Sequence, residues 1–146
     1  MSRVIGLDHG TRRIGVAVGD TETGMAFPRR ALRRRSQEAD LARIGELVAG
    51  EEAELVVIGL PLNMDGSEGD QARLARTFGD ALSSAGIQVA YMDERLSSWE
   101  AGERLAEAGR RPARRSGELD STAARVILQQ YLDARRRTGP PPEETA

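Results

Sequence analysis

Four acidic residues stand where apolar segments of the sequence end or begin. Asp8 closes the run RVIGLD, Asp93 and Glu94 close VAYMDE, and Asp120 opens the segment DSTAARVILQQYL. Carboxylates contributed by separate segments are the oxygen ligands that Mg²⁺ and Mn²⁺ bind. Such ions activate water and stabilise the attacking and leaving oxygens when a phosphodiester bond is cleaved. The acids therefore predict a divalent-metal site, provided that the fold brings them together.

Each acid also has a structural interpretation. Asp8 precedes a glycine-containing turn and could simply begin it. Asp120 could be the N-cap of a helix, although a helix that starts one turn earlier would place it on the core-facing side with Ala124 and Ile127. Asp93 and Glu94 are adjacent in a strand, so their side chains point to opposite faces of the sheet. At most one of these two acids can face a common site.

The basic residues are all arginine, 21 in number, and the net charge is −2. The planar guanidinium group suits two-point contacts with phosphate. Arg12 and Arg13 follow Asp8 closely and could bind a phosphate there, with solvation of a turn as the alternative. Arg95 could pair with whichever of the two adjacent acids faces away from the site. Arginine clusters at 29–35, 110–115 and 135–137 could form a phosphate-binding surface despite the near-neutral total charge.

The elements that must position these residues can be inferred from hydrophobic periodicity. Three strands come first, and Pro28 marks the third as an edge strand. Strands then alternate with helices, which predicts an antiparallel meander continued by parallel βαβ crossovers. The expected strands are 4–7, 14–18, a segment within 24–34, 54–60 and 87–92, and the expected helices are 38–49, 71–84 (with Leu74, Phe78 and Leu82 on one face), 99–108 and 119–132.

This order predicts an α/β protein with a mixed five-stranded sheet flanked by helices. We expect one domain over 1–137 and a disordered tail over 138–146, where proline and glutamate are frequent. The loop PLNMDGSEGD between the fourth strand and the next helix is dense in turn-forming residues, and its Asn63, Asp65 and Ser67 supply hydrogen-bonding groups. A role in capping the following helix is the alternative for this loop.

Composition excludes several classes of protein. The chain has 146 residues, of which 39% are hydrophobic and 30% charged, values typical of a globular domain. No apolar run approaches the roughly 18 residues of a membrane span, and the N-terminus does not resemble a signal peptide. Cysteine is absent, so disulfides and thiolate metal sites are excluded. The simplest expectation is a cytoplasmic protein that does not bind membranes.

Four segments resemble, in order, the signature segments of the YqgF/RuvX family of RNase H-like nucleases. They are GLDHGTRRIGVAVGD, VVIGLPLNMDGSEG, DERLSSWEA and LDSTAARVILQQYLD, and the match spans nearly the whole chain, from Ile5 to Asp133. Members of this family are described as Holliday junction resolvases and as nucleases that process pre-16S ribosomal RNA. The resemblance implies an RNase H-like fold, Mg²⁺ or Mn²⁺ as cofactor, and products with a 5′-phosphate and a 3′-hydroxyl.

The resemblance also implies roles for individual residues. The family's catalytic and metal-binding acids fall on Asp8, Glu94 and Asp120, and its GLPLNMDG loop, which is expected to face the substrate, falls on 59–66. Arg12, Arg13, Asn63, Ser67 and Arg95 are then the expected substrate-binding residues. Small departures occur at His9, at LSS in place of a usual pair of threonines, and at LDS in place of a usual isoleucine-aspartate pair. His9 is the only histidine and invites a general-base interpretation, which metal-activated water would make unnecessary.

Three classes of function remain open at this point. The leading hypothesis is a metal-dependent endonuclease that processes the 5′ end of pre-16S rRNA, with cleavage of Holliday junctions as its alternative. A resolvase would cut two symmetrically placed strands and should therefore form a homodimer. A non-catalytic nucleic-acid-binding factor is a third possibility. An ATP-binding protein of the actin and sugar-kinase type shares the first motif, but 146 residues supply only one of the two domains that such proteins need.

Overall fold

The computed structural model describes residues 2–94 and 118–138, and of residues 118–120, 137 and 138 it describes the backbone alone. Its centre is a five-stranded mixed sheet in the order β3-β2-β1-β4-β5. β1 pairs antiparallel with β2, and β2 with β3, whereas β4 runs parallel to β1 and to β5. The predicted fold class is therefore confirmed. The strands are β1 Arg3–His9, β2 Arg13–Asp20, β3 Met25–Arg33, β4 Ala53–Leu60 and β5 Val89–Asp93.

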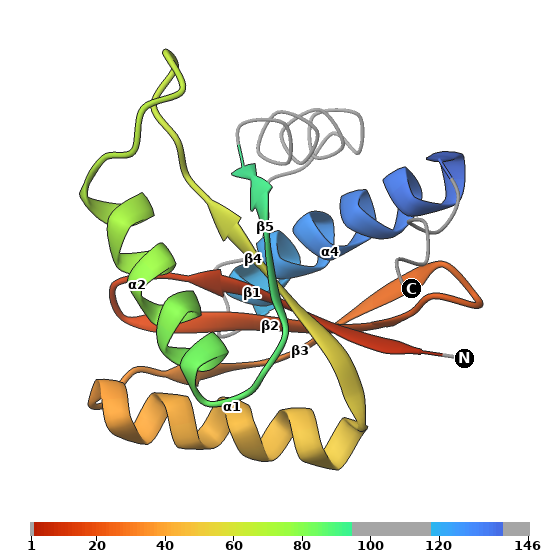
Figure 1. Ribbon diagram of the computed structural model, residues 1–146, viewed down its shortest axis with the longest axis horizontal. Coiled ribbons are helices and arrows are strands. Elements are labelled where there is room, and N and C mark those ends of the chain that lie inside the picture. The colour runs from red at the N-terminus through yellow and green to blue at the C-terminus, as the bar shows by residue number, and fades with distance from the viewer. Residues whose placement is uncertain (1, 95–117, 139–146) are drawn as a thin grey trace.

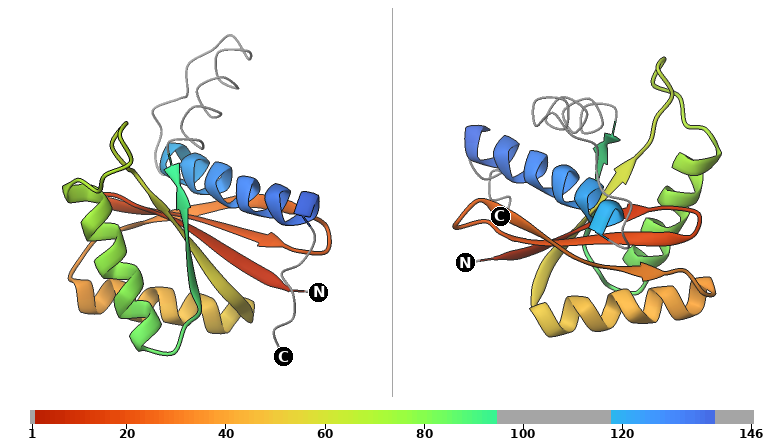
Figure 2. Two further views of the ribbon diagram at one scale, coloured as in Figure 1. Left: turned by 45° about the horizontal axis from the view of Figure 1, so that its top comes forward. Right: turned by 180° about the vertical axis from the view of Figure 1, so that it is seen from behind.

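Helices cover both faces of this sheet, as Figures 1 and 2 show. Ile5 and Leu7 of β1 are buried on the face that packs against α1 and α2. Val4 of β1 and Val57 of β4 are buried on the opposite face, which packs against α4. Successive residues of a strand point to opposite faces, so β1 supplies apolar side chains to both layers. The helices are α1 Gln37–Glu51, α2 Asp70–Ser84 and α4 Glu118–Thr138.

The helix α2 differs in one respect from its sequence pattern. Leu74 was expected on the same face as Phe78 and Leu82, but it is 49% exposed. The buried stripe consists instead of Ala75, Phe78, Gly79 and Leu82, which follow the spacing of one helical face. Small residues at 75 and 79 allow α2 to approach the sheet closely, and Leu74 lies one position outside that stripe.

The edge strand β3 and the helix α4 follow their predictions. β3 pairs only with β2 in the described sheet, which is where a proline such as Pro28 is tolerated. α4 includes the predicted segment 119–132 and continues to Thr138. The expected helix 99–108, Arg95 and all but the first residue of the expected tail 138–146 lie outside the described residues. Among the described helices, none is both long and apolar enough to traverse a bilayer.

Candidate metal site at the carboxyl edge of the sheet

The carboxyl ends of three parallel strands meet at one edge of the sheet. β1, β4 and β5 run in the same direction, and Asp8 and Glu94 lie at or just beyond the ends of β1 and β5. Asp8 points to the α4 side, because Gly6, two residues earlier, approaches Leu128 of α4. Met92 of β5 packs into the same layer, so Glu94 also points there. The fold thus brings two acids that are far apart in the sequence to one side of the sheet.

Glu94 is in direct contact with Asp8. Burial raises the pKa of Glu94 to about 7, and the negative charge of Asp8, a side-chain hydrogen bond with Asp8 and the charge of Asp93 contribute to the same rise. A carboxyl pair of this kind shares a proton, or binds a cation, because two adjacent carboxylates repel one another at low dielectric. The structure therefore also answers which of the two adjacent acids faces Asp8, and it is Glu94.

A glycine makes this contact possible. A Cβ atom at Gly59 of β4 would lie 2.6 Å from Oε2 of Glu94, 2.7 Å from its Cγ and 2.6 Å from Cδ1 of Ile127. Any other residue here would displace the Glu94 side chain or the helix α4. From the sequence, Gly59 was expected only as the first residue of the loop that faces the substrate, not as a neighbour of Glu94. The available signal was a glycine within the otherwise apolar run ELVVIGL, which often marks a close approach to a backbone.

The first described turn of α4 lies near the same edge. Ser121 is fully buried; its hydroxyl donates to the carbonyl of Arg29 and accepts from the backbone N–H of Val16 at 3.4 Å. Asp120 precedes Ser121 inside the helix, so it is not the residue that flanks the helix as an N-cap. Its position in this turn agrees with a helix that begins before Asp120. Its role as a third ligand remains a prediction.

The Asp8–Glu94 pair has the chemistry that a divalent cation requires. Both groups are hard oxygen donors. Burial and the neighbouring charge of Asp8 disfavour the ionised form of Glu94, which is why its pKa is raised, and a bound cation would offset this. Within residues 2–94 and the described side chains of α4, no group of three His, Cys, Asp or Glu residues forms a metal cluster. The two described acids fit Mg²⁺ or Mn²⁺, and a complete ligand set needs donors beyond them.

His9 lies on the opposite face of the sheet from Asp8. It is 5% exposed, and its ring packs against Phe78 of α2 with the ring centroids 4.8 Å apart. Both ring nitrogens lack a hydrogen-bond partner among the described residues. Burial and the charge of Arg34 lower the pKa of His9 to about 4, against a smaller raising effect of Asp40. His9 is thus a neutral core residue. Because its side chain points to the opposite face of the sheet from Asp8, it is not placed to act as a general base at the acid pair.

The turn between β1 and β2 carries Arg12 and Arg13 next to Asp8. A pocket of about 330 Å³ is lined by Asp8, Gly10, Thr11 and both arginines. The N–H of Gly10 donates to the carbonyl of Arg13 at 2.9 Å, and a Cβ at Gly10 would lie 2.8 Å from that oxygen. The tight turn therefore requires glycine at position 10, and Arg12 and Arg13 line the same pocket as Asp8. Contact of either arginine with a phosphate remains a prediction.

Asn63 and Ser67 lie in the loop between β4 and α2, and the structure engages their side chains within that loop. Nδ2 of Asn63 donates to Oγ of Ser67 at 3.0 Å, and Oγ of Ser67 donates to Oδ1 of Asp65 at 2.6 Å. These bonds fix the loop and leave Met64 92% exposed at its tip. Contacts of Asn63 and Ser67 with a substrate remain predictions, and so does a contact from Arg95, which lies outside the described residues.

Comparison with known proteins shows the family of this chain. The profile of the family described as "RuvX: Holliday junction resolvase" matches residues 2–134. A protein of Anaeromyxobacter sp. (strain Fw109-5), named "Putative pre-16S rRNA nuclease", is 48% identical over 134 residues, which are 91% of this chain and 98% of the relative. A protein of Myxococcus xanthus (strain DK1622) with the same name is 47% identical over 135 residues, 92% of this chain and 89% of the relative.

Solved structures show the same fold at low sequence identity. The structure described as "T. thermophilus RuvC in complex with Holliday junction substrate" aligns with a TM-score of 0.63 and 18% identity, covering 94% of this chain and 98% of that one. The large terminase nuclease of the thermophilic phage G20c aligns with a TM-score of 0.56 and 15% identity, covering 89% of this chain and 81% of that one. At these identities the alignments establish the RNase H-like fold and no more.

Proposed function

Because this chain belongs to the RuvX family, we propose that it is a metal-dependent nuclease that hydrolyses phosphodiester bonds in structured nucleic acid. The observation that carries the proposal is the contact between Asp8 and Glu94 at the carboxyl edge of the sheet, with the pKa of Glu94 raised to about 7. A metal-binding acid pair, two neighbouring arginines and an RNase H-like sheet form a coherent site for this reaction.

The proposed site assigns a role to each group. Asp8, Glu94 and Asp120 would hold Mg²⁺ or Mn²⁺, which when bound lowers the pKa of water and stabilises charge on the reacting oxygens. Gly59 and Ile127 hold the Glu94 side chain toward Asp8. Arg12 and Arg13 neutralise and orient the phosphate that enters the adjoining pocket. Hydrolysis forms a bond from water oxygen to phosphorus and breaks the P–O3′ bond, and a proton passes to O3′.

The substrate we favour is pre-16S rRNA, which the protein would process at its 5′ end. Two relatives that are nearly half identical to this chain over almost its full length have names that specify a pre-16S rRNA nuclease. Cleavage of Holliday junctions is the second candidate, favoured by the description of the family and by the Holliday junction substrate in the RuvC complex. A resolvase would act as a homodimer.

The test compares both substrates under identical conditions. Labelled ribosomal RNA precursor and a synthetic four-way DNA junction are each incubated with purified protein in Mg²⁺ or Mn²⁺. Asp8→Asn removes the proposed ligand. Asp20→Asn is the matched control, because Asp20 of β2 lies opposite Arg3 in the β1–β2 register, at the far end of β1. Cleavage of RNA that only Asp8→Asn abolishes would support the proposal.

Other results of this experiment would separate the alternatives. Junction cleavage abolished in Asp8→Asn would identify a resolvase and predict a dimer by light scattering. Tight binding of either substrate without cleavage in both metals would support the non-catalytic binding factor. Cleavage that persists in Asp8→Asn would contradict the proposed site.

A further inference from the structure

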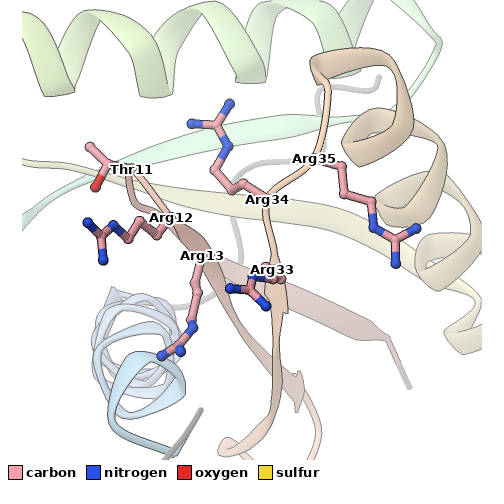
Figure 3. A pocket seen from close by; sticks show the side chains of 6 residues that line it. All are labelled: Thr11, Arg12, Arg13, Arg33, Arg34 and Arg35. Carbon is pink, nitrogen blue, oxygen red and sulfur yellow. The ribbon is translucent and has the colours of Figure 1, made fainter.

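A second pocket adjoins the acid pair and is lined almost entirely by arginine. It measures about 550 Å³ and lies between the β1–β2 turn and the end of β3. Figure 3 shows the side chains of Arg12, Arg13 and Arg33 on the same side of the two segments, and that of Arg35 toward α1. The lining residues are Thr11, Arg12, Arg13, Arg33, Arg34 and Arg35.

A buried carboxylate holds the two sides of this pocket in place. Asp40 of α1 is 1% exposed; its oxygens accept from Nε of Arg34 at 3.4 Å and from the backbone N–H of Arg35 at 3.1 Å. Nη1 of Arg34 donates to the carbonyl of Gly10 at 3.2 Å, and its backbone N–H donates to the carbonyl of Arg12 at 2.8 Å. Arg34 thus links α1 to the turn beside Asp8, and the pocket is fixed by buried contacts.

Three of the arginines that line the pocket have no ion-pair partner among the described residues. Arg12, Arg33 and Arg35 are exposed, and in the described part of the chain no carboxylate forms an ion pair with their side chains. Other arginines differ: Arg29 pairs with Glu51, and Arg76 with Glu68. Several arginines and a threonine that line one pocket favour a polyanion whose oxygens accept two-point hydrogen bonds.

The arginine pocket adjoins the pocket at Asp8. Thr11, Arg12 and Arg13 line both of them, so an anion in the arginine pocket would lie next to one in the pocket at Asp8. A chain of phosphates is the polyanion that could occupy both at once. The lining offers cationic groups and one hydroxyl, the kinds of group that make most contacts with phosphate oxygens and sugars.

We propose that the arginine pocket is a phosphate subsite that binds the backbone of the nucleic-acid substrate at a position outside the scissile phosphate. Arg33 and Arg35 are binding residues of this subsite, and Arg34 with Asp40 positions it. The subsite makes binding independent of base sequence and aligns the scissile phosphate with Asp8 and Glu94. This inference rests on the proposed nuclease function.

Binding measured without metal tests the subsite apart from catalysis. Fluorescence anisotropy with a labelled RNA stem in EDTA gives the Kd of the wild type, of Arg33→Ala/Arg35→Ala and of the control Arg30→Ala, an exposed arginine of β3 that does not line the pocket. Circular dichroism verifies that each variant is folded. Arg34 is left intact because it supports the turn.

The double variant should raise Kd roughly three- to tenfold, because exposed ion pairs are individually weak. The slope of log Kd against log salt should fall by about 1 for each phosphate that the variant no longer binds, equally for stems of different sequence. Arg30→Ala should change neither quantity. In cleavage assays the double variant should raise KM, since it weakens binding of the substrate.

Several outcomes would overturn the subsite. An unchanged Kd and salt slope in the double variant would do so even if the protein cleaves RNA. An equal increase in Kd in Arg30→Ala would mean that RNA binds to the general positive charge of the surface and not to the pocket. Competition by polyglutamate as effective as that by RNA of equal charge would indicate an acidic protein partner. Conversely, a selective loss of RNA binding in a protein that cleaves nothing would keep the subsite and reject the nuclease.

Discussion

Asp40 and Glu94 are carboxyl groups withdrawn from solvent, and the structure surrounds them in opposite ways. Asp40 is met by the guanidinium groups of Arg34 and Arg43 and by a backbone N–H. Glu94 contacts the carboxyl group of Asp8, and burial together with the negative charges of Asp8 and Asp93 raises the pKa of Glu94 to about 7. Breaking a buried ion pair destabilises the fold, whereas a buried acid placed against another acid costs stability and marks a functional site.

The two acids also differ in what they connect. Asp40 joins α1 to the β3–α1 connection and, through Arg34, to the turn after β1. Glu94 joins the ends of β5 and β1 across Gly59 of β4. The two acids therefore act on different parts of the segment that connects β1 to β2: Glu94 contacts Asp8 before the turn, and Arg34, the partner of Asp40, contacts the turn itself. Substitution of Glu94 should therefore affect catalysis, and substitution of Asp40 should affect folding.

The largest expected effect is on catalysis at Glu94. Glu94→Gln should lower the cleavage rate by more than about 100-fold, since even residues that only orient a metal ligand are worth about 10- to 100-fold. Asp93→Asn is the matched control, because Asp93 occupies the neighbouring position on the opposite face of β5. Its rate should stay within a few-fold of the wild type. Equal losses in both variants would mean that charge at the strand end matters, not the contact with Asp8.

Removal of the paired acid should instead destabilise the protein. Asp40→Ala leaves Arg34 without its buried partner, and breaking such a pair costs about 3 kcal/mol or more. Urea unfolding followed by circular dichroism measures this loss. Glu46→Ala, an exposed acid on the same helix, should change stability by less than about 0.5 kcal/mol. A small effect at Asp40 would show that its ion pairs contribute little to the fold.

Gly59→Ala should affect both properties, because the added Cβ meets Glu94 and Ile127 at 2.6 Å. Overpacking of this kind costs roughly 1–3 kcal/mol, and displacement of the Glu94 carboxyl should reduce cleavage as well. Thermal unfolding and single-turnover cleavage of the same preparation measure the two effects. Gly45→Ala on α1 is the control, since a Cβ there meets nothing within 4 Å. Full activity in Gly59→Ala would contradict the role of this glycine in positioning Glu94.

The smallest effect on catalysis is expected at His9. His9→Phe replaces a neutral buried ring by one of similar size beside Phe78, on the face of the sheet that does not carry the acid pair. The cleavage rate at neutral pH should remain within about threefold of the wild type, since the ring is already uncharged there. A loss approaching that of Glu94→Gln would restore the general-base interpretation of His9.

Much of the fold followed from periodicity. Alternating and continuous apolar runs located the five strands, and Pro28 placed the third at an edge. Leu74 was assigned to the wrong side of α2, because in that segment small residues, not large ones, define the buried stripe. Such a stripe is visible only when the surface that it packs against is known.

The site was predictable in its residue types and less so in its contacts. Asp8 and Glu94 could be placed at strand ends. Strand alternation alone left Asp93 and Glu94 open; the family resemblance implied Glu94, and only the structure shows its contact with Asp8. The pairing of Asp40 with Arg34 and the arginine pocket have no periodic signature, since side chains from a helix, a turn and a strand end meet there only in three dimensions.

The claim that Asp8 and Glu94 form a cation site is tested most directly by thermal unfolding. The wild type and Asp8→Asn are unfolded in EDTA and in increasing concentrations of Mn²⁺. If the acid pair is a cation site, Asp8→Asn should unfold in EDTA at the same temperature as the wild type or higher, because it removes repulsion from Glu94. Mn²⁺ should raise the Tm of the wild type progressively, and that of Asp8→Asn much less. A lower Tm of Asp8→Asn in EDTA with an undiminished response to Mn²⁺ would contradict the account.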